Sequence, residues 1–225
     1  MRLSKHALTI TLTATMLIGL VSVATAQTDV HQIADRVDRH YNSLRTMQAE
    51  FTEIYKGAGM SRTESGTLWL KRPGRMRWDY RTPREKIFLT DGKSAWFYVP
   101  GEKQARKAPI KTLNDLRSPL AYLLGKTKLE KEFNGLSLAP DITPIVPGDV
   151  VLRGVPRNMA DRVSDVILEV APDGHFQRIV AQEADGSITE FRFSNERTNI
   201  PVPDAKFKFS PPAGVETVQA NELSQ

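Results

Sequence analysis

The stretch GTLWLKRPGRMRWDYR, residues 66–81, decides the fold. Its side chains alternate with a period of two, which is the period of a β-strand and not that of a helix. In the second half, Met76, Trp78 and Tyr80 share one face, and charged residues occupy the other. Pro73 ends the first half, since proline cannot continue a strand ladder. The stretch therefore predicts two neighbouring strands, each with an apolar face.

The same period recurs on both sides of this stretch and predicts further strands. We expect them at residues 47–52, 85–90, 94–99, 163–170, 176–183, 187–194 and 206–209. Tight turns are expected at the three Asp-Gly pairs, 91–92, 173–174 and 185–186. Residues 56–65 are rich in Gly and Ser and are predicted to be a loop. Many short strands at this spacing indicate one antiparallel sheet.

Two segments break the β pattern and predict helices. Residues 29–44 repeat apolar side chains every three to four positions, which predicts an amphipathic helix capped by Thr28 or Asp29. Within residues 109–126, short helices are expected at 112–116 and 118–124. A curved sheet that is covered by a few helices, and not by a second sheet, tends to enclose a cavity.

The first 26 residues have the layout of a secretion signal. Arg2 and Lys5 precede an apolar run, and an Ala-x-Ala box ends at Ala26. The alternative is an uncleaved anchor, but the run is short for a membrane span. We expect a signal peptide at residues 1–26 and a single domain at 27–225. The chain has no cysteine, and Gln27 follows the cleavage site, so we expect a periplasmic protein that is not lipidated.

Composition and motifs argue against several function classes. Removal of Arg2 and Lys5 lowers the formal net charge from +5 to +3, and the basic residues are dispersed, so we expect no nucleic-acid binding. The histidines have no partners at metal-ligand spacing. No nucleophile elbow and no P-loop is present. We therefore expect no enzyme activity, no metal and no cofactor.

One apolar surface remains as the candidate functional feature. Leu68, Leu70 and Arg72 share a strand face, and Trp69 and Lys71 take the opposite face. Arg72 ends this apolar row, where a guanidinium needs hydrogen-bond acceptors such as the carbonyl groups of a covering helix. A normal core with a surface arginine is the alternative. The candidate cavity residues are Val37, Leu68, Leu70, Met76, Trp78, Tyr80, Leu120 and Leu123.

Five motifs in order along the chain resemble the LolA family of periplasmic lipoprotein carriers. They are GTLWLKRP at 66–73, Trp78, DGK at 91–93 with WFY at 96–98, SPL at 118–120, and AKFKFSPPAGV at 205–215. Each motif is weak by itself, but their order over nearly the whole of residues 27–225 is specific.

The resemblance implies an unclosed antiparallel β-barrel, a half-barrel, with a lid of short helices over a hydrophobic cavity. It implies that acylated lipoproteins are taken from an inner-membrane lipoprotein-releasing ABC transporter and passed to an outer-membrane lipoprotein receptor. It also implies that Arg72 latches the lid and that Trp78 lies in the cavity. Met76 departs from the aromatic residue that is usual at its position. We expect a monomer.

Three other functions fit the sequence less well. An outer-membrane receptor of similar fold would be lipidated, but no cysteine is available. An envelope regulatory half-barrel that senses lipids or lipoproteins is the main alternative, although such proteins usually carry a second domain. A lipid-processing hydrolase would need a nucleophile constellation.

Overall fold

One curved sheet of 12 strands dominates the fold. The computed structural model describes residues 29–110 and 128–220. The strands are β1 (Thr46–Gly57), β2 (Met60–Lys71), β3 (Arg75–Thr82), β4 (Lys86–Asp91), β5 (Ser94–Tyr98), β6 (Gln104–Pro109), β7 (Phe133–Leu138), β8 (Val150–Pro156), β9 (Val163–Val170), β10 (Phe176–Glu183), β11 (Ile188–Thr198) and β12 (Glu216–Gln219). The helical elements in the described ranges are α1 (Val30–Ser43), α3 (Leu129–Glu132), η3 (Arg157–Met159) and η4 (Asp204–Phe207).

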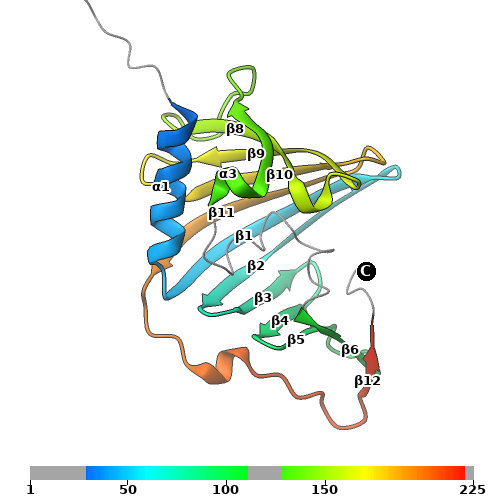
Figure 1. The fold of residues 1–225 in the computed structure, drawn as a ribbon. Coiled ribbons are helices and arrows are strands. Elements are labelled where there is room, and N and C mark those ends of the chain that lie inside the picture. Colours follow the sequence, from blue (N-terminus) through cyan, green and yellow to red (C-terminus); the bar gives the residue numbers. More distant parts are fainter. Residues whose placement is uncertain (1–28, 111–127, 221–225) are drawn as a thin grey trace, which may run out of the picture.

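The strand order shows that the sheet is not closed. It runs β12-β6-β5-β4-β3-β2-β1-β11-β10-β9-β8-β7, with β12 and β7 as the two edges. Neighbouring strands are antiparallel except for β12, which is parallel to β6. The sheet bends strongly between its edges (Figure 1). This confirms the predicted mainly β, unclosed antiparallel architecture.

Helix α1 lies across one end of the strands β8 to β11 (Figure 1). Its buried residues, among them Ile33, Val37 and Tyr41, belong to the same hydrophobic cluster as the inner face of the sheet. Asp29 caps the helix by accepting a hydrogen bond from the His31 amide at 2.9 Å. Predicted limits of 29–44 and observed limits agree to within one residue at each end.

The opposite, outer face of β2 to β5 is covered by the chain that follows β11. This C-terminal segment, residues 199–215, runs below β3 to β5 in Figure 1 and leads into β12. Phe207 is only 1% exposed, and Phe209 contacts Trp96 with ring centroids 5.3 Å apart. The inner face of this half of the sheet is therefore buried, and its outer face is partly covered.

The predicted strands 163–170 and 176–183 match β9 and β10. The three Asp-Gly turns are also confirmed, because Gly92, Gly174 and Gly186 all have positive φ. At the first turn, the Asp91 carboxylate accepts hydrogen bonds from the amides of Lys93 and Ser94. The predicted helices at 112–116 and 118–124 lie outside the described residues.

The predicted loop at 56–65 is wrong. The turn comprises only Ala58 and Gly59, and β1 and β2 pair without interruption up to it. Residues 60–63 are exposed, so this arm carries polar side chains and lacks the apolar alternation that identifies a half-buried strand.

The strand predicted at 206–209 is also wrong, because residues 204–207 form the 3-10 helix η4. Phe207, which ends η4, is buried, and Phe209, two residues later, packs against Trp96 on the outer face of the sheet. Strands β6, β7, β8 and β12 were not predicted. In β6 the small residues Ala105 and Ala108 are buried between basic residues, and this gives little apolar periodicity.

No helix in the two described ranges is both long and apolar enough to cross a membrane.

Candidate functional site

The inner face of the sheet is a continuous apolar surface built by strand pairing. Leu68 lies opposite Trp78, and Leu70 lies opposite Met76, in the antiparallel pair β2–β3. Trp78 in turn faces Phe88 on β4. Directly paired residues project to the same side of a sheet. Alternation in each strand therefore produces apolar rows that run across the sheet.

Aromatic rings gather around Trp78 at the centre of this face. Phe51 contacts Trp78 edge to face with centroids 4.6 Å apart, and Tyr80 contacts Phe51 at 4.9 Å. Phe191 and Phe193, from β11, lie 5.5 and 6.3 Å from Trp78. Such pairs stabilise a core by about 0.5–1.5 kcal/mol each beyond their buried area. They form a surface without charge at the level of Trp78.

The structure brings most of the predicted cavity residues together. All six that lie in the described ranges belong to one hydrophobic cluster and are at most 2% exposed: Val37, Leu68, Leu70, Met76, Trp78 and Tyr80. Leu120 and Leu123 lie outside the described residues. That these side chains line a ligand cavity remains a prediction.

Several inner-face residues were missed. Phe51, Phe88, Phe97, Phe191 and Phe193 are all buried in the same cluster. The alternation of residues 187–194 already put Phe191 and Phe193 on one face, but the sequence could not show that β11 pairs with β1. Their proximity to Trp78 depends on that long-range pairing.

Arg72 lies just beyond the end of β2. It is two positions after Leu70, so the alternation of the strand places both on the same face. Its side chain is partly buried, and its amide donates a hydrogen bond to the Arg45 carbonyl at 2.9 Å. Trp69 projects to the outer face, where the Lys206 ammonium lies 4.6 Å from its ring centroid. The predicted division of faces in this strand is therefore correct. The latch role of Arg72 stays a prediction.

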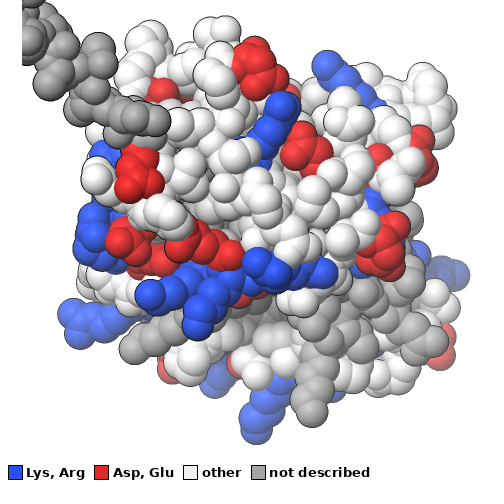
Figure 2. All heavy atoms as spheres, turned by 45° about the horizontal axis from the view of Figure 1, so that its top comes forward, with Lys and Arg blue, Asp and Glu red and all other residues white. Residues whose placement is uncertain are grey.

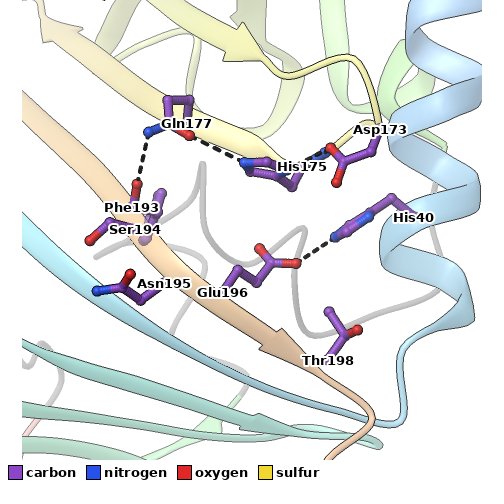
Figure 3. A pocket seen from close by; sticks show the side chains of 9 residues that line it. All are labelled: His40, Asp173, His175, Gln177, Phe193, Ser194, Asn195, Glu196 and Thr198. Carbon is purple, nitrogen blue, oxygen red and sulfur yellow. Dashed lines mark hydrogen bonds and ion pairs between the residues drawn. The ribbon is translucent and has the colours of Figure 1, made fainter. Parts of the chain in front are cut away.

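A separate polar pocket of about 380 Å³ opens between α1 and the strands β10 and β11 (Figure 3). Its walls are His40, Asp173, His175, Gln177, Phe193, Ser194, Asn195, Glu196 and Thr198. Figure 3 shows His40 and Glu196 approaching from opposite sides, with 2.7 Å between Nε2 and Oε1. His175 lies beside Asp173, with 2.6 Å between Nδ1 and Oδ1.

The first of these pairs holds α1 on the sheet. His40 comes from α1 and Glu196 from β11, so their contact links the helix to the strand. The pKa of Asp173 lies below its ordinary value, because hydrogen bonds from His175 outweigh the opposing effect of burial. The ring centroids of His40 and His175 are 6.1 Å apart. This proximity was not predicted from the sequence. Among the described residues, no cluster of His, Asp and Glu could hold a metal ion.

Charge on the surface is mixed. Figure 2 shows acidic and basic side chains interspersed among uncharged residues on the face that it displays, without a continuous field of one sign. Exposed ion pairs such as Arg84 with Glu102, at 3.3 Å, contribute little to stability.

Comparison with known proteins adds a family to this geometry. The family model described as "Outer membrane lipoprotein carrier protein LolA" matches residues 42–210. The chain is 30% identical over 181 residues to an outer-membrane lipoprotein carrier protein of Nitrosospira multiformis, covering 78% of this chain and 83% of the relative. A protein of the same name from Methylococcus capsulatus is also 30% identical, with 82% and 86% covered.

A solved structure of similar fold comes from Thermus thermophilus, where it is described as an uncharacterized conserved protein. It superposes with a TM-score of 0.50 at 15% identity, covering 84% of this chain and 98% of that chain. At this identity the likeness supports the fold alone.

Proposed function

The chain belongs to the LolA family of outer membrane lipoprotein carrier proteins, and from this we propose that it carries lipoproteins with their acyl chains held against the inner face of its sheet. The observation that carries the proposal is the apolar inner face centred on Trp78, on a sheet that does not close. Members of this family are carriers, so we propose no catalytic step.

Such a surface suits the chemistry of the cargo. Each acyl methylene group exposed to water costs about 0.8 kcal/mol, so three long chains cost on the order of 30 kcal/mol. A lipoprotein therefore needs cover while it crosses an aqueous compartment. The rows around Leu68, Trp78 and Phe88 offer aromatic and aliphatic groups that match hydrocarbon chains and make no demand for hydrogen bonds.

If the carrier releases its lipoprotein without an energy source, the lid over the acyl chains must be held by weak interactions. We propose that Arg72 latches a lid formed by the short helices that the sequence predicts at 112–116 and 118–124, through hydrogen bonds that each contribute about 1 kcal/mol net. A few such bonds keep the apolar surface from water and still break when cargo enters or leaves.

We propose that the carrier works in the periplasm after a signal peptide, residues 1–26, is removed. Cargo would come from an inner-membrane lipoprotein-releasing ABC transporter and go to an outer-membrane lipoprotein receptor.

Acyl-dependent binding tests the function. Purified protein is mixed with a purified bacterial lipoprotein and with the same polypeptide carrying serine in place of its acylated cysteine, and complexes are measured by native mass spectrometry. We expect a complex with the acylated form alone. Equal binding of both forms would show that the polypeptide, and not the acyl group, is recognised, and would refute the proposal.

A further inference from the structure

Four buried polar residues interrupt the inner face along one line across β1 to β4. We call Glu53, Glu64, Tyr80 and Lys86 the polar row, and they are 8%, 5%, 2% and 4% exposed. Glu53 lies directly opposite Glu64, and Tyr80 lies directly opposite Lys86. The row therefore follows from strand register and is part of the same face as Trp78.

Close contacts tie the row together. The Lys86 ammonium lies 2.7 Å from Glu64 Oε2 and 4.2 Å from the centroid of the Tyr80 ring. The Tyr80 hydroxyl donates a hydrogen bond of 2.6 Å to Glu53 Oε2. These contacts fix two carboxylates and one ammonium at the inner surface.

The row separates two different environments. On one side of the row, two positions further along each strand, the inner face carries Phe51, Trp78 and Phe88. All three are buried. On the other side, β2 continues into residues 60–63 of the hairpin arm, which are exposed. The polar row thus marks the limit of the apolar surface on this half of the sheet.

Strands β9 to β11 carry no polar residue on the inner face at the positions that continue the row from Glu53. Phe191 lies opposite Glu53, Ile179 lies opposite Phe191, and Leu168 lies opposite Ile179. All three are buried and apolar. The apolar surface therefore extends further along β9 to β11 than along β1 to β4.

Stability alone does not explain a buried ion pair at this place. Replacing such a pair with apolar residues of similar volume is often neutral or stabilising. A leucine and a methionine in place of Glu64 and Lys86 would simply continue the surface formed by Leu68 and Phe88.

We infer that the polar row is a specificity determinant that sets how far an acyl chain reaches along β1 to β4. Hydrocarbon gains less by packing against Glu64 and Lys86 than against apolar side chains, because it supplies no hydrogen bond to these charged groups. Chains that are long enough to reach the row stop there or turn toward β9 to β11. This inference rests on the proposed function, since it concerns the same acyl-binding face.

The test is a chain-length series. Saturated fatty acids from about ten to about twenty carbons are titrated against the full chain, since each added methylene on an apolar surface raises affinity about fourfold. For the wild-type protein we expect this rise to stop at one length. In E64L/K86M the break should move to longer chains, which then bind about tenfold tighter or more.

A matched control changes an ion pair on the outer face of the neighbouring strands β1 and β3. Glu50 and Arg81 form such a pair, and E50L/R81M should leave the break where the wild-type protein has it. An unchanged break in E64L/K86M would overturn the inference. Absence of any fatty-acid binding by the wild-type protein would instead count against the proposed function.

A second measurement needs no variant. A fatty acid with a photoreactive diazirine at its methyl end is bound to the wild-type protein, irradiated, and located by peptide mass spectrometry. We expect labels at Leu68, Trp78 or Phe88 or on β9 to β11, and none on residues 54–63. Labelling of that hairpin arm by the longer chains would contradict the boundary.

Discussion

Gly66 shows how one position shapes the inner face. A Cβ atom built there would lie 2.0 Å from the Asp79 carbonyl oxygen and 2.9 Å from Cε1 of Phe51. The missing side chain lets β2 and β3 approach while the Phe51 ring lies beside the strand. The position has no room for a side chain, and Gly66 lies between Leu68 and Glu64 in the row of residues on the inner face of β2.

We expect Gly66→Ala to lower the free energy of unfolding by about 1–3 kcal/mol, because the strand or the ring must move. Urea denaturation followed by tryptophan fluorescence measures the change. Gly154→Ala serves as the control, since the nearest atom to its Cβ lies at 3.2 Å. A smaller loss for Gly66→Ala than for Gly154→Ala would show that the close approach at Gly66 does not matter.

Arg72 is the residue on which the proposed latch depends. Leucine at this position keeps an apolar side chain but removes every side-chain donor, so we expect Arg72→Leu to slow the transfer of lipoprotein to acceptor membranes several-fold. Transfer is measured by following a labelled lipoprotein from carrier to outer-membrane vesicles. Arg192→Leu, at an exposed outer-face position, is the control. Transfer by Arg72→Leu at the wild-type rate would refute the latch.

Face assignments within a strand were predictable at this scale. The alternation of residues 68–72 correctly separated Leu68 and Leu70 from Trp69, because the side-chain period of a strand is fixed. The polar row was not predictable, since Glu64 fell in the supposed loop and its proximity to Lys86 comes from pairing across three strands.

At the scale of elements, the C-terminal segment is held on the outer face by charge as well as by Phe207. The Asp204 carboxylate lies 2.5 Å from the Lys71 ammonium and 3.0 Å from Arg75 Nη1. The hydrogen bond from Lys71 and the positive charges of Arg75 and Lys71 lower the pKa of Asp204. Lys206 adds a contact with Asp79 at 3.0 Å.

This lowered pKa makes a pH-dependent prediction. Because the folded pKa of Asp204 lies below the unfolded value of about 3.9, its contribution is complete above that value and disappears as the pH falls through the folded pKa. We expect Asp204→Asn to have a lower Tm than the wild-type protein at pH 7, and the gap to close in acid. Thermal melts across pH measure this.

Asp161→Asn, at an exposed position, provides the reference for removal of a carboxylate. If the Tm gap between Asp204→Asn and the wild-type protein were the same in acid as at pH 7, the ionised carboxylate would not be what holds the segment.

The errors in predicting elements share a physical cause. The hairpin arm at 60–63 and the strand β6 are stabilised by backbone pairing with neighbours and carry little apolar alternation. At the end of η4 and just after it, Phe207 and Phe209 alternate like residues of a strand, although the chain does not pair there. Alternation of apolar residues identifies a strand that buries one face. Strands with exposed residues on both faces, or with small buried residues, are therefore not recognised from the sequence.

At the scale of the whole molecule, the two faces of the sheet have different covers and different tasks. The C-terminal segment runs along the outer face of β2 to β5 (Figure 1), whereas the inner face is an apolar cluster around Trp78. The fold class followed from many short strands and few helices. The pairing of β1 with β11 joins strands that are far apart in the sequence, and the pattern of residues within each strand does not reveal such a pairing.

Crosslinking from adjacent positions on opposite faces of β5 tests whether lipoproteins bind on the inner face of the sheet. Phe97 belongs to the inner cluster, whereas Trp96 packs against Phe209 on the outer face. A photoreactive phenylalanine analogue is placed at either position in cells, and captured lipoprotein is detected after irradiation. We expect capture of acylated lipoprotein from position 97 and none from position 96. Capture from position 96 alone would contradict this expectation.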